Sequence, residues 1–287
     1  MMKNGKYKIW LNGALLNADT PIVCATDRGF TLGDGLFETI KISKGAPCYL
    51  LDHFNRLRAS AKVLSLSLPY GDEALRGALL HLARINNVTE GAARLTLSRG
   101  EGKRGLALPE TTIPLCVLTL TTGLPHVGTP HTLGLSRIRR NSTSITSCHK
   151  TLAYIDNIAA RLHQEGNSNY DDVVMLDEAG ALASTTCANL FWWTGDKLYT
   201  PTLGGAVLPG TMRARVLASA RMLGVLVHEG RYGAEVLLGA QGAFITNALI
   251  GVQRLSSIDF AKIGKVNFAQ NAPTGPMAQL LSAPGAA

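Results

Sequence analysis

One lysine, Lys150, stands among small, uncharged side chains just ahead of a stretch that we expect to form a helix, residues 151–164. Partial desolvation in such surroundings disfavours the ammonium form and leaves a nucleophilic amine. An amine of this kind can form a Schiff base with a carbonyl compound. Most lysines are solvated surface charges, so the proposal that Lys150 is catalytic depends on what accompanies it.

Four other segments accompany Lys150 in a recognisable order. They are residues 27–39, 188–192, 209–213 and 244–249. In that order and at those spacings the set resembles the fold-type IV pyridoxal-phosphate enzymes, the class IV aminotransferase family. The family includes branched-chain and D-amino-acid aminotransferases and aminodeoxychorismate lyase. The resemblance implies a two-domain α+β fold like that of the D-amino-acid aminotransferases, with pyridoxal 5'-phosphate as cofactor.

The resemblance also implies which residues hold the cofactor. Lys150 would form the Schiff base, and Arg56 matches the family's phosphate arginine, whose fork suits bidentate contact with an anion. Gly210 and Thr211, at a predicted helix start, offer backbone N–H groups and the positive end of the dipole. Asn247 and Ala248 match the other phosphate-binding turn. Taken singly, each has a simpler structural interpretation, but together and in register they favour the cofactor site.

The chain departs from the family at Ser184. The family normally has a glutamate five residues before the asparagine that corresponds to Asn189, where it keeps the cofactor's ring nitrogen protonated. Here that position is Ser184. A hydroxyl can hydrogen-bond the nitrogen but cannot hold a proton there electrostatically, so we expect a weaker electron sink.

Several motifs resemble those of aminodeoxychorismate lyase, which converts 4-amino-4-deoxychorismate to 4-aminobenzoate and pyruvate for folate synthesis. Residues 98–105 are similar to its S-R-G-x-G-x-R-G segment, and Phe37 lacks the hydroxyl that D-amino-acid aminotransferases place near the substrate carboxylate. Arg99 and Arg104 are candidate partners for substrate carboxylates. The aromatising reaction tolerates a poorer electron sink, which agrees with Ser184.

Two alternatives stay open. The run from Lys150 to Tyr154 reads more like the aminotransferase K-T-L-N-Y, with Ala153 in place of the asparagine. An aminotransferase acting on D-amino or branched-chain amino acids is therefore the first alternative. A protein of this fold that has lost catalysis together with the glutamate is the second.

Apolar spacing predicts the elements that position these residues. Strands and helices are mixed rather than regularly alternating, which favours two α+β domains over a doubly wound sheet. The predicted division is a smaller domain at residues 1–122, a linker rich in glycine and proline at 123–130, and a larger cofactor-binding domain at 131–287. Its tail, from about residue 270, is expected to be weakly structured.

Composition bounds the remaining possibilities. With 46% hydrophobic and 17% charged residues among 287, the chain is globular. Neither a secretory leader nor a membrane span is evident, so we expect a cytoplasmic enzyme. The five cysteines lack metal-site spacing, so no metal is expected.

The net charge of +8 is dispersed along the chain, which argues against a nucleic-acid partner. The basic residues form one tight cluster, of Arg137, Arg139 and Arg140. A solvated loop or an anionic small-molecule substrate accounts for it. We expect a substrate bearing carboxylates and, from the family, a homodimer.

Overall fold

The computed structural model describes residues 7–163, 170–260, 264–268 and 274–282. The chain forms two compact units, one of Met1–Leu124 with Lys150–Ala153 and the other of Pro125–His149 with Tyr154–Ala287. The division at Leu124 falls within the predicted linker. The return of Lys150–Ala153 to the first unit was not predicted. None of the described helices has the length and apolarity of a membrane span.

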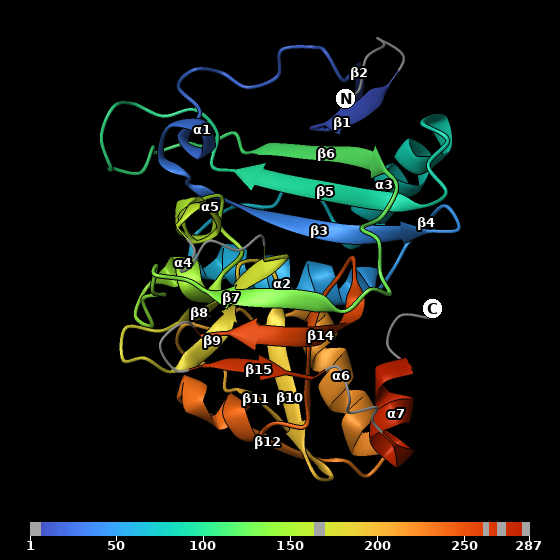
Figure 1. Cartoon of the computed structure of the whole chain (residues 1–287). Coiled ribbons are helices and arrows are strands. Elements are labelled where there is room, and N and C mark those ends of the chain that lie inside the picture. Colours follow the sequence, from blue (N-terminus) through green and yellow to red (C-terminus); the bar gives the residue numbers. More distant parts are fainter. Residues whose placement is uncertain (1–6, 164–169, 261–263, 269–273, 283–287) are drawn as a thin grey trace. The chain divides into compact units, whose positions relative to one another are not determined.

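The first unit is an antiparallel sheet in the order β2-β1-β6-β5-β3-β4, with helices on one face (Figure 1). Its elements are β1 (Lys8–Leu11), β2 (Ala14–Asn17), α1 (Arg28–Leu32), β3 (Gly35–Ser43), β4 (Ala46–Pro47), α2 (Leu50–Val63), α3 (Asp72–Ile85), β5 (Gly91–Ser98) and β6 (Leu115–Thr122).

Two-residue alternation builds the core of the first unit. Leu36, Ile40 and Ile42 of β3 are buried together with Leu95 and alternate residues of β5 and β6. Successive side chains of a strand point to opposite faces, so these residues share the face that α2 and α3 cover. The other face is left for polar and aromatic side chains.

The segment Lys150–Ala153 joins the first unit by pairing with the start of β3. The Phe37 N–H donates to the Lys150 carbonyl at 2.9 Å, and the Leu152 N–H donates to the Gly35 carbonyl at 2.9 Å. We expected a helix over residues 151–164, but α5 (Ile155–Leu162) begins later because this pairing holds the backbone extended. The residue at the centre of the candidate site is thus on a strand-like segment.

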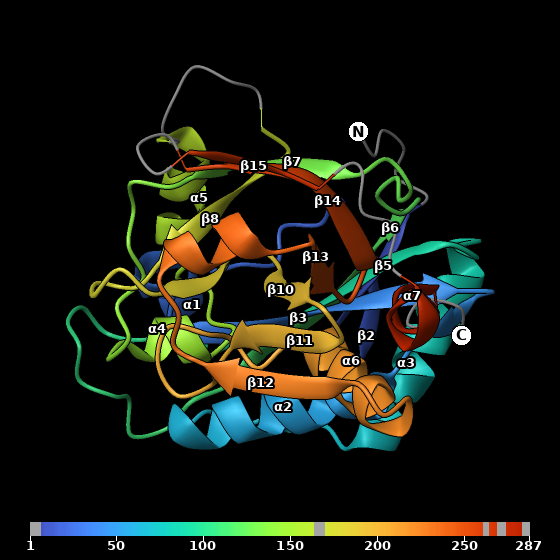
Figure 2. The ribbon, with the colours of Figure 1, turned by 60° about the horizontal axis from the view of Figure 1, so that its bottom comes forward.

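The second unit is a mixed sheet in the order β12-β11-β10-β13-β14-β7-β8-β9, with β15 paired to β14. Figure 2 shows α6 and α7 beside it. Its elements are β7 (His131–Leu135), α4 (Ile145–Cys148), α5, β8 (Asp172–Leu176), β9 (Leu182–Thr185), β10 (Asn189–Thr194), β11 (Lys197–Pro201), α6 (Thr211–Met222), β12 (Leu226–Gly230), the 3-10 helix η1 (Ala234–Gly239), β13 (Gly242–Asn247), β14 (Gly251–Asp259), β15 (Lys265–Asn267) and α7 (Gly275–Ser282).

Strand β10 is buried on both faces. Leu190 and Trp192 pack in one apolar cluster. Phe191 and Trp193 pack in another with residues of α6 and α7. A strand buried on both faces reads as a continuous apolar run, which the sequence shows here. Packing on both faces therefore holds in place the strand that Asn189 begins.

The tail differs from expectation. We predicted weak structure from about residue 270, but α7 lies within it and buries Met277 and Leu280 against the cluster that includes α6. Composition concealed the helix because alanine, proline and glycine dominate the tail as a whole. Residues 269–273 and 283–287 lie outside the described part of the chain.

Candidate functional site

Lys150 is half-buried, and its Nζ lies 4.1 Å from the centre of the Phe37 ring. The backbone pairing with β3 fixes its position. Gly35 makes this pairing possible, because a Cβ there would lie 2.6 Å from Cδ1 of Leu152 and would collide with the Leu97 carbonyl. The lysine is thus anchored by its own backbone, with its amine over an aromatic face.

Phe37 presents its ring on the sheet face opposite the helices. The Arg94 guanidinium lies 3.8 Å from the ring centre. Arg94 is on β5, where it pairs in register with Thr39, so it shares the face of Phe37. Sequence reasoning did not select Arg94, although its place in the alternation of β5 would have put it on this face. The face therefore gathers two cations, Lys150 and Arg94, around one ring.

Arg56 is bound to a carboxylate in the structure. Its Nε and Nη2 donate to the two carboxylate oxygens of Glu38 at 2.8 and 2.6 Å. His53 Nδ1 lies 2.7 Å from the same carboxylate. Glu38 follows Phe37 in β3, so it points to the opposite face, toward α2. If Arg56 binds the phosphate of a cofactor, it does so while it remains paired with Glu38.

Glu38 is ionised at neutral pH. Its side chain is 1% exposed, and burial alone would raise the pKa. The hydrogen bonds and charge of Arg56, followed by those of His53, outweigh burial and hold the pKa of Glu38 below its ordinary value. Glu38 therefore balances one positive charge at the predicted phosphate residue.

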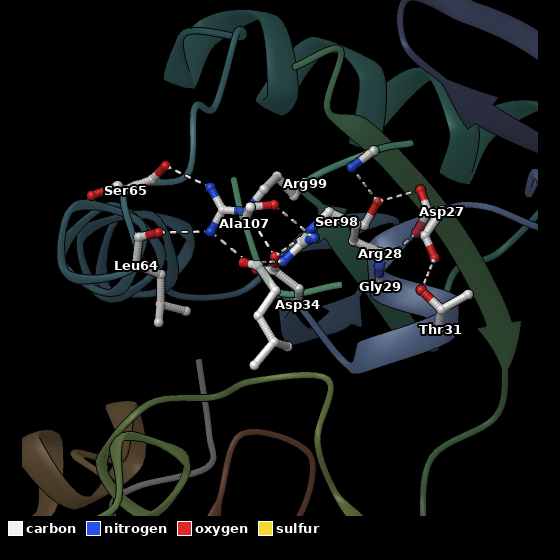
Figure 3. Close-up of polar contacts among 12 residues, drawn as sticks. Asp27, Arg28, Gly29, Thr31, Asp34, Leu64, Ser65, Ser98, Arg99 and Ala107 are labelled. Carbon is white, nitrogen blue, oxygen red and sulfur yellow. Dashed lines mark hydrogen bonds and ion pairs between the residues drawn. The ribbon is translucent and has the colours of Figure 1, made fainter. Parts of the chain in front are cut away.

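Arg99 is also occupied, by Asp34 (Figure 3). Its Nε and Nη2 bind Asp34 at 2.7 and 3.0 Å, and it donates to the carbonyls of Leu64 and Ser65 at 2.8 and 2.9 Å. Arg28 Nε binds Asp34 as well, at 2.8 Å. These contacts show Arg99 as part of the scaffold, with few donors left for a substrate.

The same network holds the loop that carries Arg104. Arg28 Nη1 donates to the carbonyls of Gly105 and Ala107 at 3.1 and 3.3 Å, which fixes the loop just after Arg104 (Figure 3). Arg104 itself is exposed, and none of the described residues forms an ion pair with it. Of the two predicted substrate arginines, Arg104 is the one with its charge available.

In the second unit, α6 begins at Thr211 with its backbone donors uncapped. Gly210 makes no side-chain cap, and the first turn holds no acidic residue. A Cβ on Gly210 would collide with Oδ1 of Asn189, so only glycine lets the helix start this close to β10. The four initial N–H groups of a helix seek acceptors, and an anion supplies them.

The turn at Asn247 lies beside residues 187–189, which also contact the start of α6. Asn247 Nδ2 donates to the Cys187 carbonyl at 3.3 Å, and its Oδ1 accepts from Leu249 N–H at 3.0 Å. Asn189 Nδ2 donates to the Leu208 carbonyl at 2.9 Å. Asn189 and Thr246 are partners in register, so the two predicted phosphate turns, with half-buried Ala248 in the second, are both tied to residues 187–189.

Ser184 is buried on β9, and its nearest charged partner is an arginine. Arg140 Nη1 lies 3.3 Å from Ser184 Oγ, and Arg140 Nη2 donates to the Ser147 carbonyl at 2.8 Å. Arg137 and Arg139 are exposed, as a solvated loop predicts, but Arg140 turns inward, which the cluster did not reveal. Glu178, the nearby carboxylate, is exposed and hydrogen-bonds Ser142 N–H at 2.9 Å.

The residues present fit pyridoxal phosphate. The lysine is anchored, the uncapped start of α6 suits its phosphate, and the Thr246 Oγ1 and Arg140 Nε atoms are buried without partners among the described residues. The described part of the chain contains no group of three His, Cys, Asp or Glu placed to hold a metal. Lys150 and Arg56 belong to the first unit, and Ser184, Gly210 and Asn247 to the second.

Comparison with known proteins bears on the family, the fold and the cofactor. The sequence model described as amino-transferase class IV matches residues 35–258. An aminodeoxychorismate lyase from Bacillus subtilis is 30% identical over 91% of this chain and 88% of its own. A putative branched-chain-amino-acid aminotransferase from Methanocaldococcus jannaschii is 28% identical over 88% of each chain. The crystal structure of 4-amino-4-deoxychorismate lyase from Pseudomonas aeruginosa matches with a TM-score of 0.79 and 26% identity over 96% of both chains. The predicted family, fold and cofactor are confirmed.

Proposed function

This chain belongs to the class IV aminotransferase family, and we propose that it converts 4-amino-4-deoxychorismate to 4-aminobenzoate and pyruvate. The observation that carries the proposal is Ser184, buried beside Arg140 where the family's glutamate is expected. Without that carboxylate the cofactor is a weaker electron sink, which an aromatising elimination tolerates better than reversible transamination. Relatives from Bacillus subtilis and Vibrio harveyi that bear the name aminodeoxychorismate lyase support it.

The reaction needs no second substrate, because the atoms of 4-amino-4-deoxychorismate divide between its two products. Pyridoxal phosphate, when bound, withdraws electrons from the carbon that bears the amino group. Lys150 attaches the cofactor and, as the free amine, removes a proton from that carbon. Arg56, Gly210 with Thr211, and Asn247 with Ala248 would hold the phosphate, and Ser184 would face the ring nitrogen.

The substrate carries carboxylates, and the first unit offers cations for them. Arg104 is exposed on a loop that Arg28 holds in place, which suits a carboxylate that arrives from solvent. Phe37 offers an apolar ring without a hydroxyl beside Lys150. Because Asp34 occupies Arg99, we assign it the positioning of the site and give direct carboxylate contact to Arg104.

The decisive experiment supplies purified, cofactor-loaded protein with 4-amino-4-deoxychorismate. We expect 4-aminobenzoate and pyruvate in equal amounts, and neither product from Lys150→Ala. Borohydride reduction followed by peptide mapping is expected to place the pyridoxyl label on Lys150. A label on another lysine contradicts the assignment of Lys150, and wild-type protein that releases no 4-aminobenzoate contradicts the reaction.

An aminotransferase is the second candidate, favoured by the run from Lys150 to Tyr154 and by relatives named as branched-chain or D-alanine aminotransferases. Only a transaminase accumulates pyridoxamine phosphate when an amino donor is added without a keto acid. Spectra of the cofactor with D-alanine, leucine and 4-amino-4-deoxychorismate separate the two reactions. A chain that binds no cofactor at all is the expected result for a protein that has lost catalysis.

The family resemblance also leads us to propose a cytoplasmic homodimer. Large apolar side chains lie exposed on the first unit, with Phe30 at 74% and Leu106 at 80%. A second copy that covered them would remove apolar surface from water. Light scattering coupled to size exclusion is expected to give twice the mass of one chain, and a monomer at working concentration would contradict the dimer.

A further inference from the structure

Arg140 is a half-buried cation of the second unit that lies against Ser184. The loop after β7 brings it there, and its own N–H donates to the Leu176 carbonyl at 2.9 Å, which fixes the backbone beside β8. None of the described carboxylates forms an ion pair with it, and its Nε is buried without a hydrogen-bond partner. A guanidinium in this setting stays protonated.

Of the titratable neighbours of Arg140, one carries a negative charge at neutral pH. Tyr154, Cys148 and Asp156 are the titratable groups that act on it, and of these only Asp156 is ordinarily ionised. Burial lowers the pKa of Arg140, and the three neighbours oppose that effect, but an arginine keeps its proton throughout the physiological range. The positive charge is therefore permanent.

That charge acts directly on Ser184. Arg140 Nη1 donates to Ser184 Oγ at 3.3 Å, and Ser184 Oγ donates to the Thr185 carbonyl at 2.8 Å. With one lone pair engaged by a cation, the hydroxyl is a better donor and a poorer acceptor. When its proton turns from the Thr185 carbonyl to the cofactor, a hydroxyl in this state is suited to donate to a neutral ring nitrogen. It is poorly suited to accept from a protonated one.

We propose that Arg140, acting through Ser184, keeps the ring nitrogen of bound pyridoxal phosphate unprotonated. This inference rests on the proposed function, because it requires the cofactor to be bound with its ring nitrogen at Ser184. Two effects act in the same direction: the cation repels a second positive charge, and the hydroxyl donates to the neutral nitrogen. Arg140 is a positioning residue, because it acts on the ring nitrogen through Ser184.

The test is nitrogen NMR of the holoenzyme loaded with ring-labelled pyridoxal phosphate. We expect wild type to give the signal of an unprotonated, hydrogen-bonded ring nitrogen at pH 7. Arg140→Met is expected to raise the pH at which this nitrogen takes up its proton by about one unit. Arg139→Met, which removes an exposed charge one residue away, is the matched control and is expected to leave the signal unchanged.

A second pair of variants keeps the test decisive if Arg140→Met does not fold. Arg140→Lys retains the charge and is expected to leave the nitrogen unprotonated, whereas Ser184→Glu is expected to protonate it. A protonated nitrogen in wild type overturns the proposal, and so does an unchanged titration in Arg140→Met.

The outcomes also separate this inference from the proposed reaction. Cofactor bound with an unprotonated nitrogen, but without release of 4-aminobenzoate, contradicts the reaction and supports the role of Arg140. Failure to bind cofactor overturns both. Release of 4-aminobenzoate by an enzyme whose ring nitrogen is protonated supports the reaction and overturns the role of Arg140.

Discussion

Arg56 is the residue at which binding and stability are hardest to separate, because it pairs with Glu38 inside the first unit. Removal of one partner from a buried pair leaves the other charged and unmatched. We expect Arg56→Ala to lower the free energy of unfolding by about 3–5 kcal/mol, before any effect on cofactor retention. Urea unfolding of the cofactor-free protein measures this loss.

Arg58 supplies a control on the same helix. It pairs with Asp72, but both side chains are well exposed, at 38% and 41%. Arg58→Ala is therefore expected to cost less than about 1 kcal/mol. If Arg56→Ala proves no more costly than Arg58→Ala, the Glu38 pair contributes little. Loss of cofactor by Arg56→Ala could then be assigned to the phosphate contact alone.

At this scale, sequence reasoning selected residues that stand in short local motifs. Lys150, Gly210 and Asn247 stand in short motifs, and Ser184 was located by counting from Asn189. Arg140 and Glu38 were not found, because their partners are 44 and 18 residues away in sequence and only the folded chain brings each pair together. The residue types within one segment do not tell which distant side chain each of them will contact.

At the scale of elements, Asp34 links β3 and β5 to the Arg104 loop. Burial would raise the pKa of Asp34, but hydrogen bonds and charge from Arg99 and Arg28 lower it below the ordinary value. We expect Asp34→Asn to release the Gly105–Ala107 carbonyls from Arg28 and to increase trypsin cleavage at Lys103 and Arg104. Peptide mass mapping after brief digestion measures this, and unchanged cleavage would show that Arg28 holds the loop without Asp34.

Because Arg28 and Arg99 lower the pKa of Asp34, the stability of the first unit depends on pH. A carboxylate whose folded pKa is lowered stabilises the fold above its unfolded value, near 3.9, and loses that contribution as pH falls through the folded value. The unfolding free energy of wild type is thus expected to decline between about pH 5 and pH 2. The decline should be shallower in Asp34→Asn, as acid-range urea titrations would show.

Gly35 lets the Lys150 segment pair with β3. We expect Gly35→Ala to displace that segment or to part β3 from β5, because a Cβ would meet both Leu152 and the Leu97 carbonyl. Gly77→Ala on α3 is the control, since a Cβ there meets no atom within 4 Å and alanine favours a helix by roughly 0.5–1 kcal/mol. Hydrogen exchange at the Phe37 and Leu152 amides reports the pairing, and equal protection in Gly35→Ala would contradict its role.

Elements with strong periodicity were predicted well, and those decided by tertiary contact were not. Phe54, Leu57 and Ala61 recur at helical spacing in the sequence, which predicts a helix there, and the structure shows α2 (Leu50–Val63). The segment after Lys150 was predicted as helix, but hydrogen bonds to β3 keep it extended through Leu152. Strand pairing with a distant partner outweighed local propensity there.

At the scale of the whole molecule, the proposed cofactor residues are shared between the two units. Lys150 belongs to the first and Ser184 to the second. A ligand that binds folded residues of both units stabilises both by mass action. Calorimetry is expected to show a higher unfolding temperature with cofactor than without it. A shift confined to one transition would assign the cofactor to one unit.

The chain crosses between the units three times, and the second crossing delivers Lys150–Ala153 to a sheet whose strands are all formed by residues before Leu124. During synthesis the first unit can therefore assemble its strands and helices while one backbone edge, at Gly35 and Phe37, still lacks its partner. An unpaired strand edge is a template for association with other chains. The nascent protein thus passes through an interval in which this edge is open, and the interval ends when the segment of Lys150, the proposed Schiff-base lysine, leaves the ribosome and pairs with β3.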